Sequence, residues 1–181
     1  MPRKYDLGRR ADAKAETRRQ ITAAAVDLHS TVGPARTTIS AIAERAGVQR
    51  LTVYRHFPEE RDLFAACGAH WISENPPPDP APWAAIADPQ ERVVTALTEI
   101  YGWYRANEGM IGNTERDAPE LPALAQIADP SRYLDPVKEL LGPPEQRAAL
   151  GHALAFTTWR SLTREGLSDH DAAALIARIV G

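Results

Sequence analysis

The sequence predicts an all-α protein in which a three-helix helix-turn-helix domain precedes a larger helical domain. Hydrophobic residues, many of them alanine and leucine, recur at the three- and four-residue spacing of amphipathic helices. No alternating run of Val, Ile or Thr indicates a strand, and glycine and proline divide the chain into segments of helical length. With 44% hydrophobic residues, the 181-residue chain can bury a substantial core.

The first helix is predicted over about residues 13–30, after a basic arm of residues 1–12 that we expect to be mobile. Its apolar face has helical spacing and consists of Ile21, Ala24, Ala25 and Leu28. Gly33 followed by Pro34 provides the stop signal for this helix.

Two short helices are predicted next, over about residues 39–46 and 50–56. Thr38 can cap the first of them, because its hydroxyl can accept a hydrogen bond from a free amide of the first turn. Gly47 lies in the connecting turn, where a positive φ costs glycine little. Small and apolar residues stand where two crossing helices need them, at Ile42, Ala43, Val48 and Val53. This pattern indicates a helix-turn-helix, which places its second helix in the DNA major groove.

A fourth helix is predicted from Pro58 to about Ser73, because acidic residues follow the proline in its first turn. Five prolines within residues 76–82 then predict an extended loop. Asp88 and Pro89 begin a fifth helix, whose apolar stripe is Val93, Leu97, Ile100, Tyr101 and Tyr104.

Glycine and proline divide the next stretch into short helices, predicted at about residues 109–116, 119–127 and 130–141. A long helix is expected over about residues 145–165, ended by Gly166. Ser168 begins a last helix, with an apolar face of Leu175, Ile176 and Ile179.

Basic residues are concentrated at the N-terminal end of the chain. Residues 1–57 hold 11 Lys and Arg against 5 Asp and Glu, whereas the remainder holds 10 against 19. A basic segment that coincides with a helix-turn-helix pattern predicts contact with a polyanion at that end. Unevenly distributed solvating charge is the simpler alternative.

The outward side of the third predicted helix carries side chains suited to DNA. Arg50 can bond guanine O6 and N7, Gln49 can reach a base or a phosphate, and Leu51 and Thr52 can meet thymine methyls. The candidates for phosphate contact are Thr38, Ser40, Tyr54, Arg55 and His56. Tyr54 and His56 can alternatively pack under the following helix.

The basic residues of the arm, Arg3, Lys4, Arg9 and Arg10, can either reach DNA or touch nothing. Elsewhere the sequence shows no catalytic, cofactor or metal motif: the five histidines match no metal-ligand spacing, and neither a phosphate-binding glycine loop nor a nucleophile motif is present. The single cysteine, Cys67, excludes an internal disulfide. Without a signal-peptide-like or membrane-spanning apolar run, the protein is expected in the cytoplasm.

The run of residues 37–48 followed by 51–58 resembles the N-terminal domain of TetR-family transcriptional regulators, most specifically in the ending Tyr54-Arg55-His56-Phe57. The resemblance implies a helical homodimer whose two recognition helices bind a palindromic double-stranded DNA operator. It also implies a pocket for a small-molecule effector. This chain departs from the family at two positions. Members of the family often have Gly or Pro where this chain has Leu51. They usually have a phosphate-contacting Lys where this chain has Glu60.

On this resemblance we assign residues 1–57 to the arm and DNA-binding domain and residues 58–181 to a helical effector-binding and dimerisation domain. Its candidate ligand-binding residues are Tyr101, Tyr104 and Trp159, although an ordinary core position is the favoured alternative for each single aromatic residue. The dimer seam would use the last two helices, through faces such as Leu150, Leu154 and Ser161 with Leu175, Ile176 and Ile179. The predicted function is a repressor released from DNA by a small apolar effector. The alternatives are a DNA-binding regulator without ligand control and, less favoured, a small helical enzyme.

Overall fold

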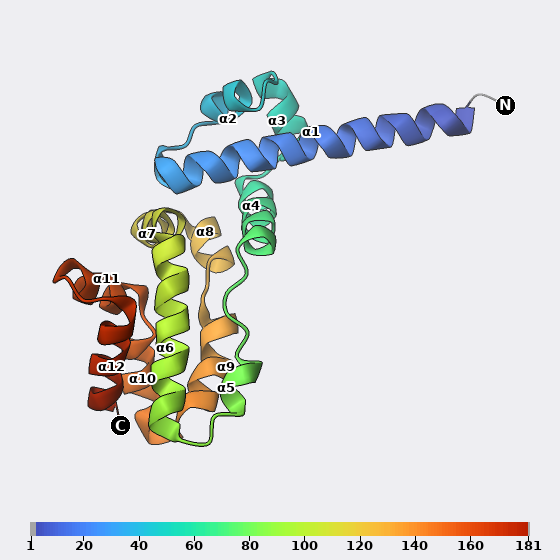
Figure 1. Ribbon diagram of the computed structural model, residues 1–181. Coiled ribbons are helices and arrows are strands. Elements are labelled where there is room, and N and C mark those ends of the chain that lie inside the picture. The colour runs from blue at the N-terminus through green and yellow to red at the C-terminus, as the bar shows by residue number, and fades with distance from the viewer. Residues whose placement is uncertain (1–2, 181) are drawn as a thin grey trace. The chain divides into compact units, whose positions relative to one another are not determined.

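The computed structural model describes residues 3–180, with side chains from Gly8 onward, and every regular element in this range is a helix (Figure 1). This confirms the predicted all-α fold. The chain forms two compact units, the first from Met1–Asn75 with Gly112–Ala128 and the second from Pro76–Ile111 with Asp129–Gly181. The functional boundary at residue 57 remains a prediction. No helix in the described range is long and apolar enough to cross a membrane.

The first unit begins with a 29-residue helix, and its N-terminal elements are α1 (Arg3–Thr31), η1 (Pro34–Arg36), α2 (Ile39–Arg45), α3 (Arg50–His56) and α4 (Glu60–Glu74). The prediction of a mobile arm over residues 1–12 is wrong from Arg3 onward, because the backbone is already helical there. Ala, Arg and Lys favour a helix, and Gly8 is the only poor helix former between Arg3 and Ala13 apart from Asp. The side chains of Arg3 and Lys4 lie outside the described residues.

The helix-turn-helix has the expected local geometry. Thr38 caps α2, since its Oγ1 accepts a hydrogen bond from the amide of Ala41 at 3.1 Å. Gly47 has a φ of 66° in the turn, a conformation that glycine adopts without steric cost. The core beneath it draws on α1, α2, α3 and α4 and consists of Ile21, Ala25, Ile42, Ala43, Val53, Phe57, Leu63 and Cys67.

The first unit is completed by a segment distant in sequence, which includes the C-terminal part of α7 (Glu108–Asp117), η2 (Ala118–Glu120) and α8 (Pro122–Ile127). Asn113 Nδ2 donates to the carbonyl oxygens of His29 at 3.0 Å and Ser30 at 2.9 Å. These carbonyls belong to the last turn of α1, where no helical amide follows to bond them. Asn113 therefore completes the C-terminal end of α1.

The neighbouring ion pair of Arg116 and Asp117 holds the connection after α1. Asp117 Oδ2 accepts from the amide of Ala35 at 3.0 Å, and Arg116 donates to the carbonyl of Val32 at 3.3 Å. Gly33 lies directly against both side chains and has a φ of 100°. A Cβ added at Gly33 would be only 2.6 Å from Asp117 Oδ2. The path of the chain from α1 into α2 is thus fixed by residues more than 80 positions away.

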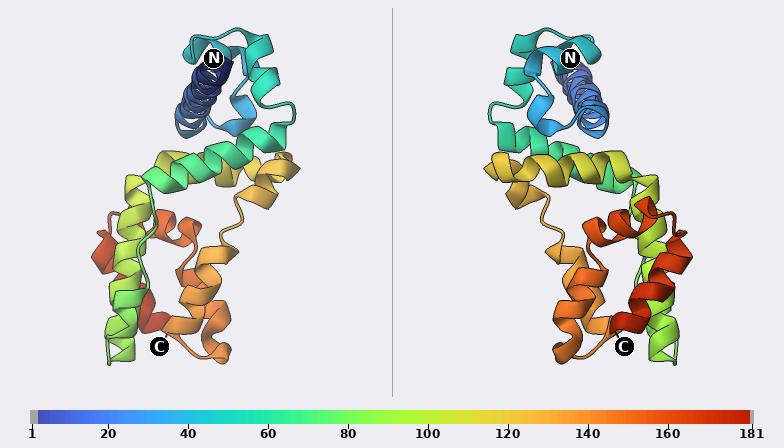
Figure 2. Two further views of the ribbon diagram at one scale, coloured as in Figure 1. Left: turned by 90° about the vertical axis from the view of Figure 1, so that its right-hand side faces the viewer. Right: turned by 90° about the vertical axis from the view of Figure 1, so that its left-hand side faces the viewer.

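The second unit packs around α6 (Pro89–Ala106) (Figure 2), and its other helices are α5 (Ala81–Ala84), α9 (Ser131–Leu141), η3 (Pro144–Gln146), α10 (Arg147–Ala153), α11 (Phe156–Arg164) and α12 (Asp169–Val180). Asp88 is confirmed as the N-terminal cap of α6, because its side chain accepts a hydrogen bond from the amide of Glu91 at 2.7 Å. The proline-rich loop is shorter than predicted, since α5 already begins at Ala81 with a proline in its first turn.

The predicted long helix over residues 145–165 is broken between α10 and α11. Ala155 leaves the helical conformation with ψ 134°, although neither Gly nor Pro stands at the break. The hydroxyl of Tyr101 donates to the carbonyl of Ala153 at 2.6 Å, and that of Tyr104 to the carbonyl of Leu154 at 2.6 Å. Two buried tyrosines of α6 thus replace helical amides as partners, which local helix propensity cannot predict.

Candidate nucleic-acid interface

The position of α3 is fixed by apolar contacts on its inner side and at its end. Val53 is completely buried, and Ile42 and Ala43 of α2 are almost completely so. At the C-terminal end, Arg18 of α1 donates to the carbonyl of His56, and its guanidinium lies 4.0 Å from the centre of the Phe57 ring. The cation thereby compensates the negative end of α3 while packing on an aromatic face.

The outer side of α3 is exposed and cationic. Leu51 is 67% exposed and Tyr54 47% exposed, while Arg50 and Arg55 are also exposed and Thr52 is half-buried. Within the described range, no hydrogen bond or ion pair involves the guanidinium of Arg50 or Arg55. These groups are available to an anionic partner at no cost in internal bonds.

Three further predicted contact residues border this surface. Thr38 and Ser40 are exposed at the start of α2, and Gln49 is exposed immediately before α3. Thr38 uses its oxygen as a cap acceptor, so its hydroxyl proton remains available to a phosphate. Thr38 and Ser40 therefore lie at the start of α2, and Gln49 lies at the start of α3, all within the helix-turn-helix.

His56 differs from the other predicted DNA contacts because its side chain is buried. Its Nδ1 has no hydrogen-bond partner among the described residues. Burial lowers the pKa of His56, and the nearby cations Lys14, Arg18 and Arg55 lower it further. The structure thus favours the packing alternative for His56, and its contact with DNA stays a prediction.

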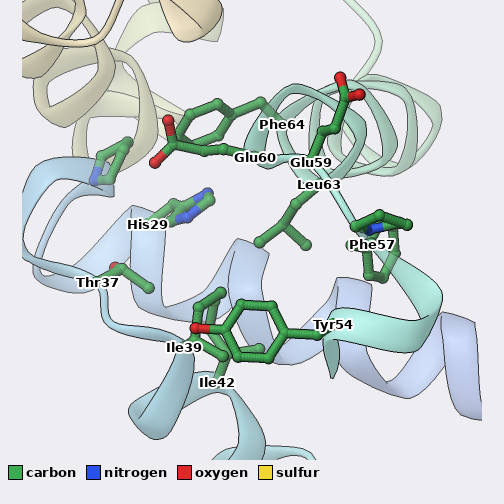
Figure 3. Close-up of a pocket in the computed structure, with 12 residues that line it drawn as sticks. His29, Thr37, Ile39, Ile42, Tyr54, Phe57, Glu59, Glu60, Leu63 and Phe64 are labelled. Atoms are coloured by element: carbon green, nitrogen blue, oxygen red, sulfur yellow. The ribbon is translucent and has the colours of Figure 1, made fainter. Parts of the chain in front are cut away.

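A cavity of about 160 Å³ lies between α2, α3 and the start of α4 (Figure 3). The ring of Tyr54 extends across it toward Ile39, so part of this side chain packs within the motif, and its contact with DNA stays a prediction (Figure 3). His29 lies between Thr37 and Phe64, with its ring centre 5.7 Å from that of Phe64. Burial lowers the pKa of His29 to about 4, against the opposing effect of Asp117, so the imidazole is neutral at pH 7.

The three predicted ligand-binding residues come together in the second unit but lie in its packed core. Tyr101 and Tyr104 bond the broken helix, and Trp159 Nε1 donates to Asp169 Oδ1 at 2.8 Å. The same carboxylate binds Arg105 through two hydrogen bonds of 2.8 Å. All three residues are at least 95% buried, and each polar atom has a protein partner. Their role in effector binding remains a prediction.

Sequence reasoning missed the residues that hold the end of α3 and the connection from α1 to α2 through contacts distant in sequence. Arg18 shows no local signal beyond its charge, and the bonds of Asn113 and Asp117 depend on tertiary placement. Cys67 is buried, which raises its pKa to about 12 and keeps the thiol protonated. Among the described residues, no three His, Cys, Asp or Glu side chains gather closely enough to hold a metal ion.

A helix-turn-helix held on a buried scaffold, with an exposed cationic second helix, defines a DNA-binding protein. Residues 21–67 match the family model of bacterial regulatory proteins, tetR family. Residues 21–67 therefore carry the DNA-binding domain of TetR-family transcriptional regulators, which confirms the resemblance that the sequence predicted. None of the curated proteins compared with the chain matches it.

Solved structures share the fold over nearly the whole chain. A transcriptional regulator from Rhodococcus sp. RHA1 has a TM-score of 0.65 at 17% identity, covering 90% of this chain and 95% of that chain. A TetR-like regulator from the same source has a TM-score of 0.62 at 20% identity, covering 91% and 93%. RolR in complex with resorcinol has a TM-score of 0.51 at 20% identity, covering 94% and 90%. At these identities the likeness establishes the fold alone.

Proposed function

We propose that this regulator binds a palindromic operator as a homodimer, with α3 of each protomer in one of two successive major grooves. The observation that carries the proposal is Arg50, whose exposed guanidinium on the first turn of α3 has no partner among the residues that the structure describes. An arginine in this position can form two bonds with guanine. Gln49, Leu51 and Thr52 complete the base-reading side in this proposal. Because bacterial DNA lies in the cytoplasm, we place the protein there.

Phosphates on either side of the groove are assigned to the flanking polar groups. Thr38 and Ser40 at the start of α2, and Tyr54 and Arg55 late in α3, are exposed enough for this role. His56 reaches a phosphate only if its ring leaves the interior. Glu60, exposed at the start of α4, would repel a phosphate there, and the exposed Arg61 beside it would offset that repulsion in part.

The proposed dimer forms through the last two helices, α11 and α12. Leu150, Leu154 and Ile176 are buried within the protomer and cannot form the seam predicted for them. The side chains that support the proposal are Ile179, which is 70% exposed, Leu175 and Ser161. A two-fold seam across these residues would cover Ile179, the most exposed large hydrophobic side chain of the described range.

We further propose that the regulator is a repressor and that a small, mainly apolar effector releases it from DNA. RolR, which has the same fold, binds the phenolic compound resorcinol. In this chain, a ligand with its own hydrogen-bonding group would compete for the hydroxyls of Tyr101 and Tyr104, beside the ring of Trp159. Binding would therefore free the carbonyls of Ala153 and Leu154 and change the α10–α11 break.

A regulator without ligand control is the second candidate. The observation that favours it is the satisfied, closely packed state of Tyr101, Tyr104 and Trp159, which leaves no polar atom of theirs unbonded. Thermal shift with a panel of phenols and fatty acids separates the two candidates. A ligand that raises Tm and releases DNA supports effector control, whereas a panel without any shift supports the second candidate.

Selection of bound duplexes from a random DNA pool tests the proposed function. We expect two inverted half-sites with centres one helical turn apart or a multiple of it. Arg50→Ala should cost about 1–3 kcal/mol of specific affinity and relax one base position in each half-site. Arg132→Ala, which removes an exposed cation from α9, is the control and should leave affinity unchanged. Enrichment of no sequence, or equal affinity for Arg50→Ala, contradicts the proposal.

A further inference from the structure

The N-terminal half of α1 carries a basic stripe, in which the sequence predicts only Arg10 as a candidate for DNA contact. Arg10, Lys14 and Arg18 are spaced four residues apart, so they occupy one face of the helix on successive turns. All three are exposed. Figure 1 shows this half of α1 extending beyond α2 and α3 of the same unit.

The stripe faces the same side of α1 as the helix-turn-helix. Ile21 and Ala25 lie seven residues beyond Lys14 and Arg18 on that face, and both are completely buried in the core under α2 and α3. Arg18 marks the junction, because its guanidinium bonds the carbonyl of His56 at the end of α3. The basic face therefore continues directly from the recognition helix onto the projecting part of α1.

Cationic groups from both helices gather at this junction. Lys14 and Arg18 of α1, together with Arg55 of α3, all act electrostatically on His56 and lower its pKa. In the range the structure describes, the Lys14 ammonium takes part in no hydrogen bond or ion pair. An unpaired lysine beside two arginines is a local excess of positive charge, which a polyanion would neutralise.

We propose that the N-terminal half of α1 is a second DNA-binding element, in which Lys14 and Arg10 bind phosphates beside the major groove that receives α3. The inference rests on the proposed DNA binding by α3. From Arg10 to Arg18 the stripe is about 12 Å long, a length of duplex that carries roughly seven phosphate charges. Because the element is a helix, it meets the DNA backbone as a rigid rod and adds affinity without reading bases.

The test compares salt-dependent DNA affinity between two α1 variants of equal charge. Lys14→Gln removes the stripe's central cation. Arg19→Gln removes a cation about 140° round the same helix, where Arg19 pairs with Glu16. The probe is the duplex most enriched in the random-pool selection, with mixed-sequence flanks on both sides. Affinity is measured from about 50 to 200 mM salt, a range over which phosphate contacts weaken strongly.

For Lys14→Gln we expect the slope of log K against log salt to become shallower by about 0.9 per bound chain. Between about 50 and 200 mM salt, the variant should therefore lose about 3.5-fold less affinity than the unaltered protein for each phosphate contact removed. The selected sequence should be unchanged, and the hydroxyl-radical footprint should shrink at the same edge of each half-site. The double variant Arg10→Gln/Lys14→Gln should extend both effects, and Arg19→Gln should match the unaltered protein.

Equal slopes for Lys14→Gln and Arg19→Gln would overturn the inference. A lower Tm for Lys14→Gln with an unaltered slope would show instead that Lys14 only compensates the negative end of α3. Failure of the proposed function itself has a different signature, since the unaltered protein would then show no sequence preference and Arg50→Ala would change nothing.

Discussion

Replacing Tyr104 by phenylalanine tests whether the tyrosine hydroxyls hold the break between α10 and α11. The substitution keeps the ring, which contacts Phe156 edge-on and lies 5.9 Å from Trp159 between centres. It removes only the donor that bonds the buried carbonyl of Leu154 at 2.6 Å. A buried carbonyl without a partner costs about 1–3 kcal/mol, so we expect the free energy of unfolding to fall by that amount.

Tyr101→Phe should cost a similar amount, because Tyr101 is completely buried and its hydroxyl is the donor to Ala153. The double variant distinguishes two responses of the chain. If the carbonyls stay unbonded, the two losses add; if residues 145–165 become one continuous helix, the combined loss is smaller and far-UV helicity rises. Either result is consistent with a break held by the hydroxyls.

The assay is urea unfolding followed by far-UV circular dichroism and tryptophan fluorescence. Tyr54→Phe is the matched control, since it removes a hydroxyl from a side chain that is 47% exposed, and it should change stability by less than about 0.5 kcal/mol. If Tyr101→Phe and Tyr104→Phe are as stable as this control and leave helicity unchanged, the tyrosines do not hold the break.

Two predictions concern the first unit. Burial lowers the pKa of His29 from 6.5 to about 4. Between pH 6.5 and pH 4, the unfolded chain therefore binds a proton at this histidine more readily than the folded protein does. We expect the free energy of unfolding to fall by up to about 3 kcal/mol as the pH drops through this range. His29→Leu should lose this part of the pH dependence, and a pH profile parallel to that of the unaltered protein would refute the assignment. Asn113→Ala should cost about 1–3 kcal/mol, because two carbonyls of the last turn of α1 lose their donor. Asn107→Ala, where the amide bonds a carbonyl within its own segment, is the comparison, and equal effects would argue against a special role for Asn113.

Local sequence rules predicted the parts of the fold that depend on neighbouring residues. The bounds of α3, the Thr38 cap and the positive φ of Gly47 all follow from side-chain and backbone preferences within a few positions. The positions of Ile42 and Val53 in the helix-turn-helix pattern likewise predicted that they are buried.

The features that the sequence did not reveal depend on partners far along the chain. The α10–α11 break needs donors about 50 residues away, so high helix propensity at Ala155 gave the wrong prediction. The orientation of His56 was left open for a similar reason. The Arg18 side chain that bonds its carbonyl comes from α1, 38 residues earlier, and no spacing rule relates those positions.

The residues around α3 fall into two groups that mutation can separate. Arg50 and Arg55 have no partner among the described residues, so replacing either one should change DNA affinity while leaving Tm unaltered. Val53 and Arg18 hold α3 in place through the core and through its last carbonyl, so replacing them should lower both Tm and DNA affinity. A DNA-reading role is therefore demonstrated only by a loss of affinity at constant Tm, and Arg50 is the side chain for which the structure gives the clearest separation.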